Sequence, residues 1–221
     1  LRRRLKRSPL HPSEAASVID EIASALSAAH DHGFIHRDLK PDNVFVVERE
    51  GQLVVKILDF GVAMLATQAI TAGQVAGTPA YFSPEAAAGR PLDGRSDIYS
   101  LGVLLYELLA GLPPFQGSSM SEYVMKHMTA SPRPLAEVVL EPLPPVLVDA
   151  IGRCLEKDPD LRFQTMDELE EEQAFWTAAG LVKTTGGMPA LAKFLRDHGW
   201  SEEDITAIQS DPANAPYAGY P

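Results

Sequence analysis

Two clusters of polar residues have side-chain types and a spacing that suit chemistry on phosphate groups. The first is the run HRDLKPDN at residues 36–43, and the second is the tripeptide DFG, which begins at Asp59, sixteen residues after Asn43. Asn43 and Asp59 offer an amide and a carboxylate oxygen, which Mg²⁺ accepts as ligands when it also binds nucleotide phosphates. Asp38 or Asp59 alone could be an ordinary turn residue. The two clusters together argue against that alternative.

The pattern of apolar residues predicts a β-hairpin between these clusters. Runs rich in β-branched residues at 44–47 and 53–58 are separated by the turn-like segment 48–52. A hairpin of this length brings Asn43 and Asp59 beside each other. Both side chains are then in a position to bind one metal ion.

Helical patterns dominate the rest of the chain. Apolar residues recur at helical spacing over 12–33, and a second helix over 97–110 is apolar on most sides, with Ser96 as its expected N-cap. A long loop, 59–96, lies between the hairpin and this helix. Further helical patterns cover residues 119–128, 146–155 and 166–175. We therefore predict a mainly α fold with a small β-hairpin.

A third motif, GTPAYFSPE at residues 77–85, follows the DFG tripeptide. With the first two motifs, it resembles the eukaryotic-type (bacterial-like) serine/threonine protein kinase family. Ser83 stands where that family usually has alanine, a mild departure between two small residues. The resemblance covers roughly residues 10–175. It implies a protein-kinase-like fold, represented by its larger C-terminal lobe, with the catalytic loop at 36–43 and the activation segment at 59–85.

The resemblance also implies roles for the residues of the site. Asp38 would accept the proton of the substrate hydroxyl, and Lys40 would neutralise charge on the transferred phosphoryl group of ATP. Asn43 and Asp59 would hold Mg²⁺, and Phe45 would lie under the adenine. The implied activity is transfer of the ATP γ-phosphoryl group to serine or threonine in protein substrates.

Regulation by phosphorylation is a further expectation from the resemblance. Thr71, and after it Thr67, are candidate phosphate acceptors between the DFG and SPE motifs, and Arg37 is the natural partner of such a phosphate. The alternative is that both threonines are ordinary polar loop residues. Thr78 is a poorer candidate, because its position resembles a hydroxyl that contacts Asp38 and Lys40.

Other residues match structural positions of the family. His36 and Phe60 are expected to stack in the core beneath the site, and not to act as acid or base. Asp97 is expected to hold the backbone of the 36–43 loop. Glu85 and Arg162, 77 residues apart, are expected to form a structural ion pair.

Features of the family's N-terminal β-rich lobe do not occur among the 221 residues: there is no Gly-x-Gly-x-x-Gly run, and Lys6 is the only lysine before Asp38. We therefore expect this lobe to be absent and the chain to be a truncated kinase, weak or inactive alone. Its exposed site face is expected to bind the missing lobe or another partner. The alternative is a non-catalytic, kinase-like binding or regulatory module. The intact polar residues of the site favour the kinase.

The composition changes after the kinase-like part, so we expect a C-lobe at 1–175 and a C-terminal extension at 176–221. Within the extension, residues 190–198 and 201–210 predict a short helix pair, and 211–221 a loose tail.

The composition also excludes several classes of protein. With 19 Lys and Arg against 30 Asp and Glu, the net charge is −11, which argues against general nucleic-acid binding. Five of the basic residues lie in residues 1–7, which we expect to be a solvated lead-in to the first helix. The uncharged apolar run at 98–106 is too short to span a membrane. A single cysteine, Cys154, indicates a reducing compartment, and we expect the cytoplasm.

Overall fold

The chain forms two compact units, Leu1–Glu170 and Glu171–Pro221, which are described separately. The structure, a computed structural model, describes residues 1–49, 52–60, 79–139 and 143–171, and the single positions 196, 201, 202 and 206. The described residues of the candidate site all lie in the first unit.

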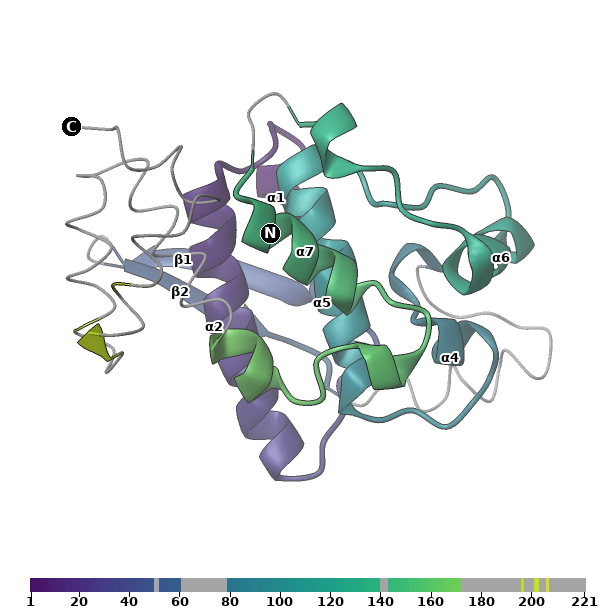
Figure 1. The fold of residues 1–221 in the computed structure, drawn as a ribbon, viewed down its shortest axis with the longest axis horizontal. Coiled ribbons are helices and arrows are strands. Elements are labelled where there is room, and N and C mark those ends of the chain that lie inside the picture. Colours follow the sequence, from purple (N-terminus) through teal and green to yellow (C-terminus); the bar gives the residue numbers. More distant parts are fainter. Residues whose placement is uncertain are drawn as a thin grey trace. The chain divides into compact units, whose positions relative to one another are not determined.

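Two long helices, α2 (Pro12–Asp31) and α5 (Gly94–Ala110), pack against each other in the first unit (Figure 1). Helix α5 is buried along most of its length, because its apolar residues lie on most sides. Helix α7 (Pro145–Cys154) packs on α5. The close approach requires Gly102, where a Cβ atom would lie 2.5 Å from Cβ of Cys154.

The start of α5 differs from the expectation. Its N-cap is Asp93, whose carboxylate accepts a hydrogen bond from the Arg95 backbone N–H at 2.9 Å. Ser96 lies inside the helix and is buried, and its hydroxyl donates to Glu85 Oε1 at 2.7 Å. The predicted cap was wrong because a tertiary partner takes this hydroxyl. The end is as predicted: Gly111 has φ of 78°, in the left-handed region that favours glycine.

Shorter elements surround the central helices. The predicted helix over 119–128 is α6 (Met120–Thr129), which begins after the N-cap Ser119. Residues 166–171 are helical, and the remainder of the pattern predicted to 175 lies outside the described residues. The other short elements are helices α1 (Arg2–Leu5) and α4 (Pro84–Ala87) and the 3₁₀ turns η1 (Pro41–Asn43), η2 (Pro79–Tyr81), η3 (Leu135–Glu137) and η4 (Pro159–Leu161).

The predicted hairpin is confirmed, with strands β1 (Val44–Arg49) and β2 (Gln52–Ile57) running antiparallel. Its register pairs Val44 with Ile57 at the base of the hairpin and continues out to its far end. Strand β2 contacts α2, and Figure 1 shows the hairpin beside that helix. The hairpin therefore joins the loop that precedes β1 to the segment that follows β2.

The second unit is described at five positions only, Glu171 at its start and the four single positions given above. Arg196 forms an ion pair with Glu202 on the surface. The helix pair predicted over 190–198 and 201–210 and the tail at 211–221 otherwise lie outside the described residues. Across the described parts of the chain, no helix combines the length and apolar character needed to cross a membrane.

Candidate active site

The backbone of the 36–43 loop is fixed by a buried carboxylate on α5. Asp97 is fully buried, and it accepts hydrogen bonds from the backbone N–H groups of His36 at 2.8 Å and Arg37 at 2.9 Å. His30, near the end of α2, lies with Nε2 2.8 Å from Asp97 Oδ2. The predicted role of Asp97 is confirmed, whereas its contact with His30 was not predicted.

Two residues of the site have an unusual backbone conformation. Arg37 has φ of 69° and Asp59 has φ of 63°, and they are the two non-glycine residues with positive φ in the described ranges. Such a conformation is unfavourable for residues with a Cβ atom and persists where the surroundings enforce it. For Arg37, the surroundings include the hydrogen bond to Asp97.

Asp38, Lys40 and Asn43 come together as one polar group. Lys40 Nζ donates to Asp38 Oδ2, and Asn43 Nδ2 donates to the Asp38 carbonyl at 2.9 Å and to Asp38 Oδ2 at 3.2 Å. The two donors turn the Asp38 carboxylate toward the amine of Lys40. All three side chains are at least partly shielded from solvent.

His36 links the 36–43 loop to the segment that ends in Asp59. Its Nδ1 accepts a hydrogen bond from the Asp38 backbone N–H at 3.2 Å, so its Nε2 carries the proton and donates to the Leu58 carbonyl at 3.0 Å. The imidazole is fully buried, and its ring centroid lies 4.8 Å from that of Phe60. The predicted stacking is confirmed, but Phe60 is 37% exposed, so the expectation that both rings lie in the core was wrong for Phe60.

Asn43 and Asp59 approach each other as the hairpin predicts. The Leu58 backbone N–H donates to the Asn43 carbonyl at 2.9 Å, which places Asp59 one residue beyond this contact. Both amide hydrogens of Asn43 face Asp38, so its Oδ1 is the atom left to act as a ligand. An amide oxygen and a carboxylate suit Mg²⁺ that is also bound by phosphates, so the donor set fits this ion.

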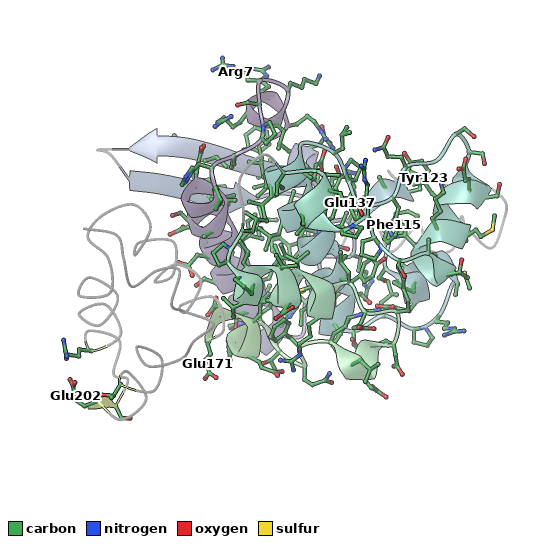
Figure 2. All side chains as sticks on the ribbon, turned by 45° about the horizontal axis from the view of Figure 1, so that its top comes forward. Arg7, Phe115, Tyr123, Glu137, Glu171 and Glu202 are labelled. Carbon is green, nitrogen blue, oxygen red and sulfur yellow. The ribbon has the colours of Figure 1, made fainter. Side chains whose placement is uncertain are left out.

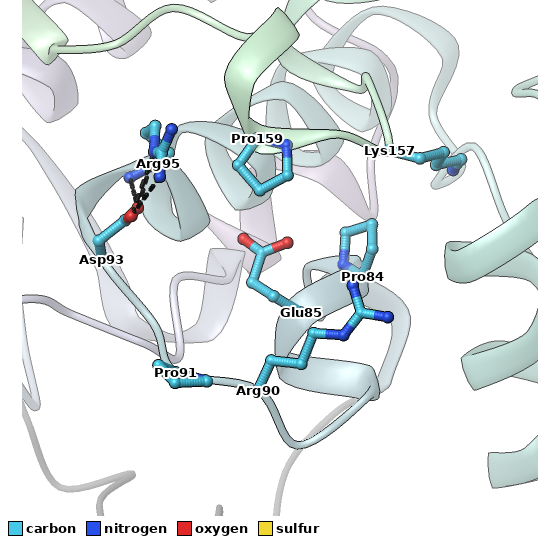
Figure 3. A pocket seen from close by; sticks show the side chains of 8 residues that line it. All are labelled: Pro84, Glu85, Arg90, Pro91, Asp93, Arg95, Lys157 and Pro159. Carbon is cyan, nitrogen blue, oxygen red and sulfur yellow. Dashed lines mark hydrogen bonds and ion pairs between the residues drawn. The ribbon is translucent and has the colours of Figure 1, made fainter.

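The predicted ion pair between Glu85 and Arg162 is confirmed. Arg162 Nη1 and Nη2 donate to the two carboxylate oxygens of Glu85 at 2.8 Å each, and both residues are buried. Burial raises the pKa of Glu85, but the hydrogen bonds from Arg162 and Ser96 outweigh it and leave this pKa below its usual value. Glu85 also lines a pocket of about 220 Å³ between α4 and the start of α5 (Figure 3). This pair anchors α4 to the body of the lobe.

A second polar network was not predicted. Arg2 donates to Asp42 Oδ2 at 3.0 Å, to Glu107 Oε1 at 2.8 Å and to the Tyr81 hydroxyl at 2.8 Å. Tyr81 in turn donates to Glu107 Oε2, and both residues are buried. Burial lowers the pKa of Arg2, but its hydrogen bonds to Asp42 and Tyr81 outweigh it and raise this pKa. The network joins α1, η1, η2 and α5.

The network corrects the expectation of a solvated basic opening. Arg2 is bound as above, and Arg4 pairs with Glu14 at 2.9 Å. Arg3, Lys6 and Arg7 are exposed, and Figure 2 shows the Arg7 side chain pointing outward from α1. The signal missed in the sequence was Glu107, an acidic residue within an apolar helix that needs a buried partner.

Large apolar side chains are exposed on and beside the hairpin. We call this set the hairpin face: Phe45 (52% exposed), Val47 (45%), Leu58 (43%) and Phe60 (37%). The sequence analysis predicted an exposed site face, and Phe45, which it placed under the adenine, is exposed here. The adjoining loop 36–43 is largely buried or half-buried, so the exposure is confined to one side of the site.

The expected regulatory threonines, Thr67, Thr71 and Thr78, lie outside the described residues, as does Gly61 of the DFG tripeptide. Their expected partner is described: the Arg37 Nε atom is buried and has no hydrogen-bond partner. A buried cationic donor without a partner is unfavourable, and an anion beside it would satisfy it.

Comparisons with known proteins agree with these features. The family model for the protein kinase domain matches residues 1–174. Serine/threonine-protein kinase PkaA of Streptomyces coelicolor is 44% identical over 159 residues, which cover 71% of this chain and 28% of that protein. Serine/threonine-protein kinase PknB of Mycolicibacterium smegmatis is 39% identical over 211 residues, covering 93% of this chain and 31% of that protein. The chain thus spans less than a third of these relatives.

A solved structure shares the fold. The Mycobacterium tuberculosis PknI kinase domain superposes with a TM-score of 0.59 and 27% identity, covering 77% of this chain and 58% of that one. The predicted mainly helical lobe of a protein kinase fold is confirmed. The resemblance was expected to end near 175, but a match over 93% of the chain must continue beyond that residue.

Proposed function

The chain belongs to the protein kinase domain family, and from this premise we propose that it is the C-terminal lobe of a serine/threonine kinase. It would transfer the γ-phosphoryl group of ATP to serine or threonine in protein substrates. The observation that carries the proposal is the group formed by Asp38, Lys40 and Asn43, on a loop whose backbone is fixed by Asp97. Phosphoryl transfer depends mainly on positioning and charge neutralisation, and these residues supply both.

In this proposal Asp38 accepts the proton of the substrate hydroxyl. Asn43 holds the Asp38 carboxylate in place through its amide N–H groups. Lys40, which pairs with Asp38 here, turns to the transferred phosphoryl group when substrate is bound.

Asn43 and Asp59 would hold Mg²⁺, which neutralises charge on the phosphates of ATP. His36 supports this pair, since it links the backbone before Asp59 to the loop that carries Asn43. Phe45 would contribute an apolar surface beneath the adenine.

We propose that the 221 residues alone are weak or inactive, because they include no Gly-rich loop and no strand lysine to cover the phosphates. The hairpin face supports the idea that another lobe or partner covers this side. We also propose the division into a C-lobe at 1–175 and an extension at 176–221, and a cytoplasmic location, which the single buried Cys154 supports.

A non-catalytic kinase-like module remains the second candidate, because the hairpin face would equally suit a docked partner. The nucleotide sequence upstream of the Leu1 codon separates the two. An in-frame Gly-rich loop and lysine support the kinase. An upstream reading frame without them supports the module.

Nucleotide binding gives a direct test of the metal ligands. The titration of ATP with Mg²⁺ into the protein, followed by NMR of the 36–43 and 52–60 backbone, should shift signals of Asn43 and Asp59. Asp59→Asn should remove the dependence on Mg²⁺. As a control, Asp160→Asn changes an exposed carboxylate far along the chain and should leave it intact. Equal Mg²⁺ dependence in Asp59→Asn would reject the proposed ligand.

Regulation is proposed at Arg37. A phosphate on Thr71, or on Thr67, would satisfy the unpartnered Nε atom and fix the neighbouring Asp38. Thr78 is proposed to contact Asp38 and Lys40 directly. Mass spectrometry of the active enzyme should find phosphate on Thr71 or Thr67, and lose it in Asp38→Asn. Full activity of a Thr67→Ala, Thr71→Ala double variant would refute the switch.

A further inference from the structure

Asn43, the proposed Mg²⁺ ligand, has a contact with the start of α1 on either side of it in the chain. The amino group of Leu1 donates to the carbonyl of Val44, the residue after Asn43, at 2.7 Å. Arg2 Nε donates to Oδ2 of Asp42, the residue before Asn43, at 3.0 Å. These contacts join α1 to the junction of η1 and β1, and the proposed mechanism uses neither of them.

The Arg2 side chain is fixed by buried partners as well as by Asp42. Its Nη1 donates to Glu107 Oε1 and its Nη2 to the Tyr81 hydroxyl, each at 2.8 Å. Tyr81 donates in turn to the other carboxylate oxygen of Glu107, and both residues are buried. Because the guanidinium is planar, bonds at its two Nη atoms also set the direction of its Nε–H group. Exposed ion pairs usually gain little because two flexible side chains must be ordered, but here the arginine is ordered already.

The η1 turn needs support from outside to hold Asn43 precisely. Inside the turn, the Asn43 N–H donates to the Lys40 carbonyl at 3.0 Å, and bonds of this 3₁₀ type have poorer geometry than those of an α-helix. Mg²⁺ requires nearly ideal octahedral geometry with ligands at about 2.1 Å, so a small displacement of Asn43 Oδ1 would weaken its binding. The Asp42 side chain is 50% exposed and reaches out of the turn to Arg2. The bond between Arg2 and Asp42 therefore limits the rotation of η1.

We propose that Arg2 is a positioning residue for Asn43 as a ligand of Mg²⁺. Its guanidinium, fixed by side chains of α5 and η2, holds Asp42 and thereby keeps η1 in the orientation that presents Asn43 Oδ1 to the metal. The inference rests on the proposed kinase function, in which Asn43 and Asp59 hold Mg²⁺. It assigns to the start of α1 a role in metal binding, exerted through η1.

The charge of Arg2 makes positioning distinguishable from simple electrostatics. A cation near a metal site repels Mg²⁺, so loss of the Arg2 charge alone would increase the gain in ATP affinity that Mg²⁺ gives. Positioning predicts that this gain becomes smaller. Arg2→Lys keeps the charge and a partner for Glu107 but lacks the planar fork that binds Asp42 at the same time. Asp42→Ala breaks the same bond and leaves the contacts of Arg2 with buried residues in place.

The affinity for ATP, measured by NMR with Mg²⁺ and with EDTA, tests the proposal on the whole 221-residue chain without catalysis. The factor by which Mg²⁺ strengthens ATP binding should fall about tenfold in Arg2→Met, Arg2→Lys and Asp42→Ala. The double variant Arg2→Met, Asp42→Ala should lose no more than either single variant, because the two residues act through one bond. Arg3→Lys changes an exposed neighbour on the same helix and is the matched control. An unchanged or larger factor in Arg2→Met would overturn the proposal.

Hydrogen exchange separates positioning from a general loss of structure. In Arg2→Lys and Asp42→Ala, the amides of Asn43 and Leu58, which bond at η1 and at the base of the hairpin, should exchange about tenfold faster. Amides of residues 101–109 in α5 should stay within about twofold of the parent. Equal acceleration in α5 would mean a merely structural role and would overturn the proposal, as would no acceleration at Asn43.

The kinetic readout uses the chain joined to a nucleotide-binding lobe. Arg2→Lys should need about tenfold more free Mg²⁺ to reach half of its maximal rate, with the KM for a peptide substrate unchanged, and excess Mg²⁺ should restore kcat. A loss of kcat that excess Mg²⁺ does not restore would contradict the inference. If Mg²⁺ does not strengthen ATP binding to the parent chain, the proposed function fails and the inference fails with it. An effect of Mg²⁺ in the parent that Arg2→Met retains in full would overturn the inference alone.

Discussion

The backbone of the 36–43 loop is held by hydrogen bonds to a fully buried aspartate, whereas the hairpin beside it exposes large apolar side chains to solvent. Asp97 accepts hydrogen bonds from two successive backbone N–H groups of the loop, and His30 contacts it as well. On the hairpin face, Phe45 and Val47 are about half exposed. The loop side has its supporting contacts within this chain, while the hairpin side lacks a covering layer among the described residues.

This difference corresponds to two separate tasks in the proposed reaction, placing the catalytic base and binding the nucleotide. The loop side carries the base and the residues that orient it, which must be placed precisely before substrate arrives. The hairpin side carries Phe45, whose proposed partner is the adenine. An apolar contact of this kind tolerates larger changes in position than the hydrogen bonds around the base do. We infer that the chemistry is preorganised in this lobe and that nucleotide binding is completed by what covers the hairpin face.

The largest effect is expected at Asp97. Asp97→Ala leaves one buried and one partly buried N–H group of the loop without a partner and should lower the free energy of unfolding by about 3 to 5 kcal/mol. Urea denaturation measures this loss. Asp160→Ala, which removes an exposed carboxylate, should change stability by less than about 0.5 kcal/mol. A loss below about 1 kcal/mol for Asp97→Ala would mean that the loop is fixed by other contacts.

A smaller effect is expected at Arg2. Arg2→Met removes the countercharge of the buried Glu107 and the bond to Asp42, and should cost about 2 to 3 kcal/mol. Arg3→Met alters an exposed neighbour on the same helix and serves as the matched control, with a change below about 0.5 kcal/mol. Thermal and urea unfolding would compare the pair. Similar losses of unfolding free energy in Arg2→Met and Arg3→Met would mean that Arg2 contributes no more to stability than an exposed basic residue.

Acid should weaken the packing between α6 and α5 through His127, which contacts Tyr99. The pKa of this residue is lowered to about 4, chiefly by burial and then by Lys157, while an unfolded histidine has a pKa of about 6.5. As the pH falls below 6.5, His127 takes up a proton in the unfolded chain, but in the folded chain it does so only near pH 4. The free energy of unfolding therefore falls between pH 6.5 and pH 4. From pH 7 to 5 the loss should be about 2 kcal/mol larger than in His127→Gln. Parallel pH curves for the two proteins would contradict this.

The smallest effect on stability is expected on the hairpin face. Phe45→Ser should change the free energy of unfolding by less than about 1 kcal/mol, because the side chain is already half exposed. It should also reduce binding of a hydrophobic dye and self-association of the isolated chain. Val44→Ser, at a buried position of the same strand, should destabilise far more. If Phe45→Ser were as damaging as Val44→Ser, the contrast between the two sides would disappear.

The sequence predicted those parts of the site that depend on local residue patterns or on family motifs. The hairpin between Asn43 and Asp59 follows from β-branched runs, and the pairing of Glu85 with Arg162 followed from the family resemblance. Local patterns do not reveal contacts between distant parts of the chain. Arg2 and Glu107 are 105 residues apart, and the predicted cap at Ser96 was wrong because its hydroxyl binds Glu85.

The positive φ of Arg37 and Asp59 also escaped prediction, for a related reason. Neither arginine nor aspartate favours the left-handed region strongly enough for the sequence alone to predict a positive φ. At Arg37, a tertiary hydrogen bond to Asp97 enforces this conformation. Conversely, Phe60 was expected in the core because of its motif, yet its side chain is 37% exposed.

The central claim is that Asp38 is the base of a phosphoryl transfer for which this lobe is prepared. The direct measurement is the transfer of labelled γ-phosphate from ATP to serine or threonine. The chain would be joined to the residues that its gene encodes upstream or, where there are none, to the nucleotide-binding lobe of another protein kinase. Asp38→Asn should lower kcat by about 10² to 10⁴ while nucleotide binding is retained, and Asp160→Asn should have no effect. Equal rates for the parent and Asp38→Asn would contradict the account.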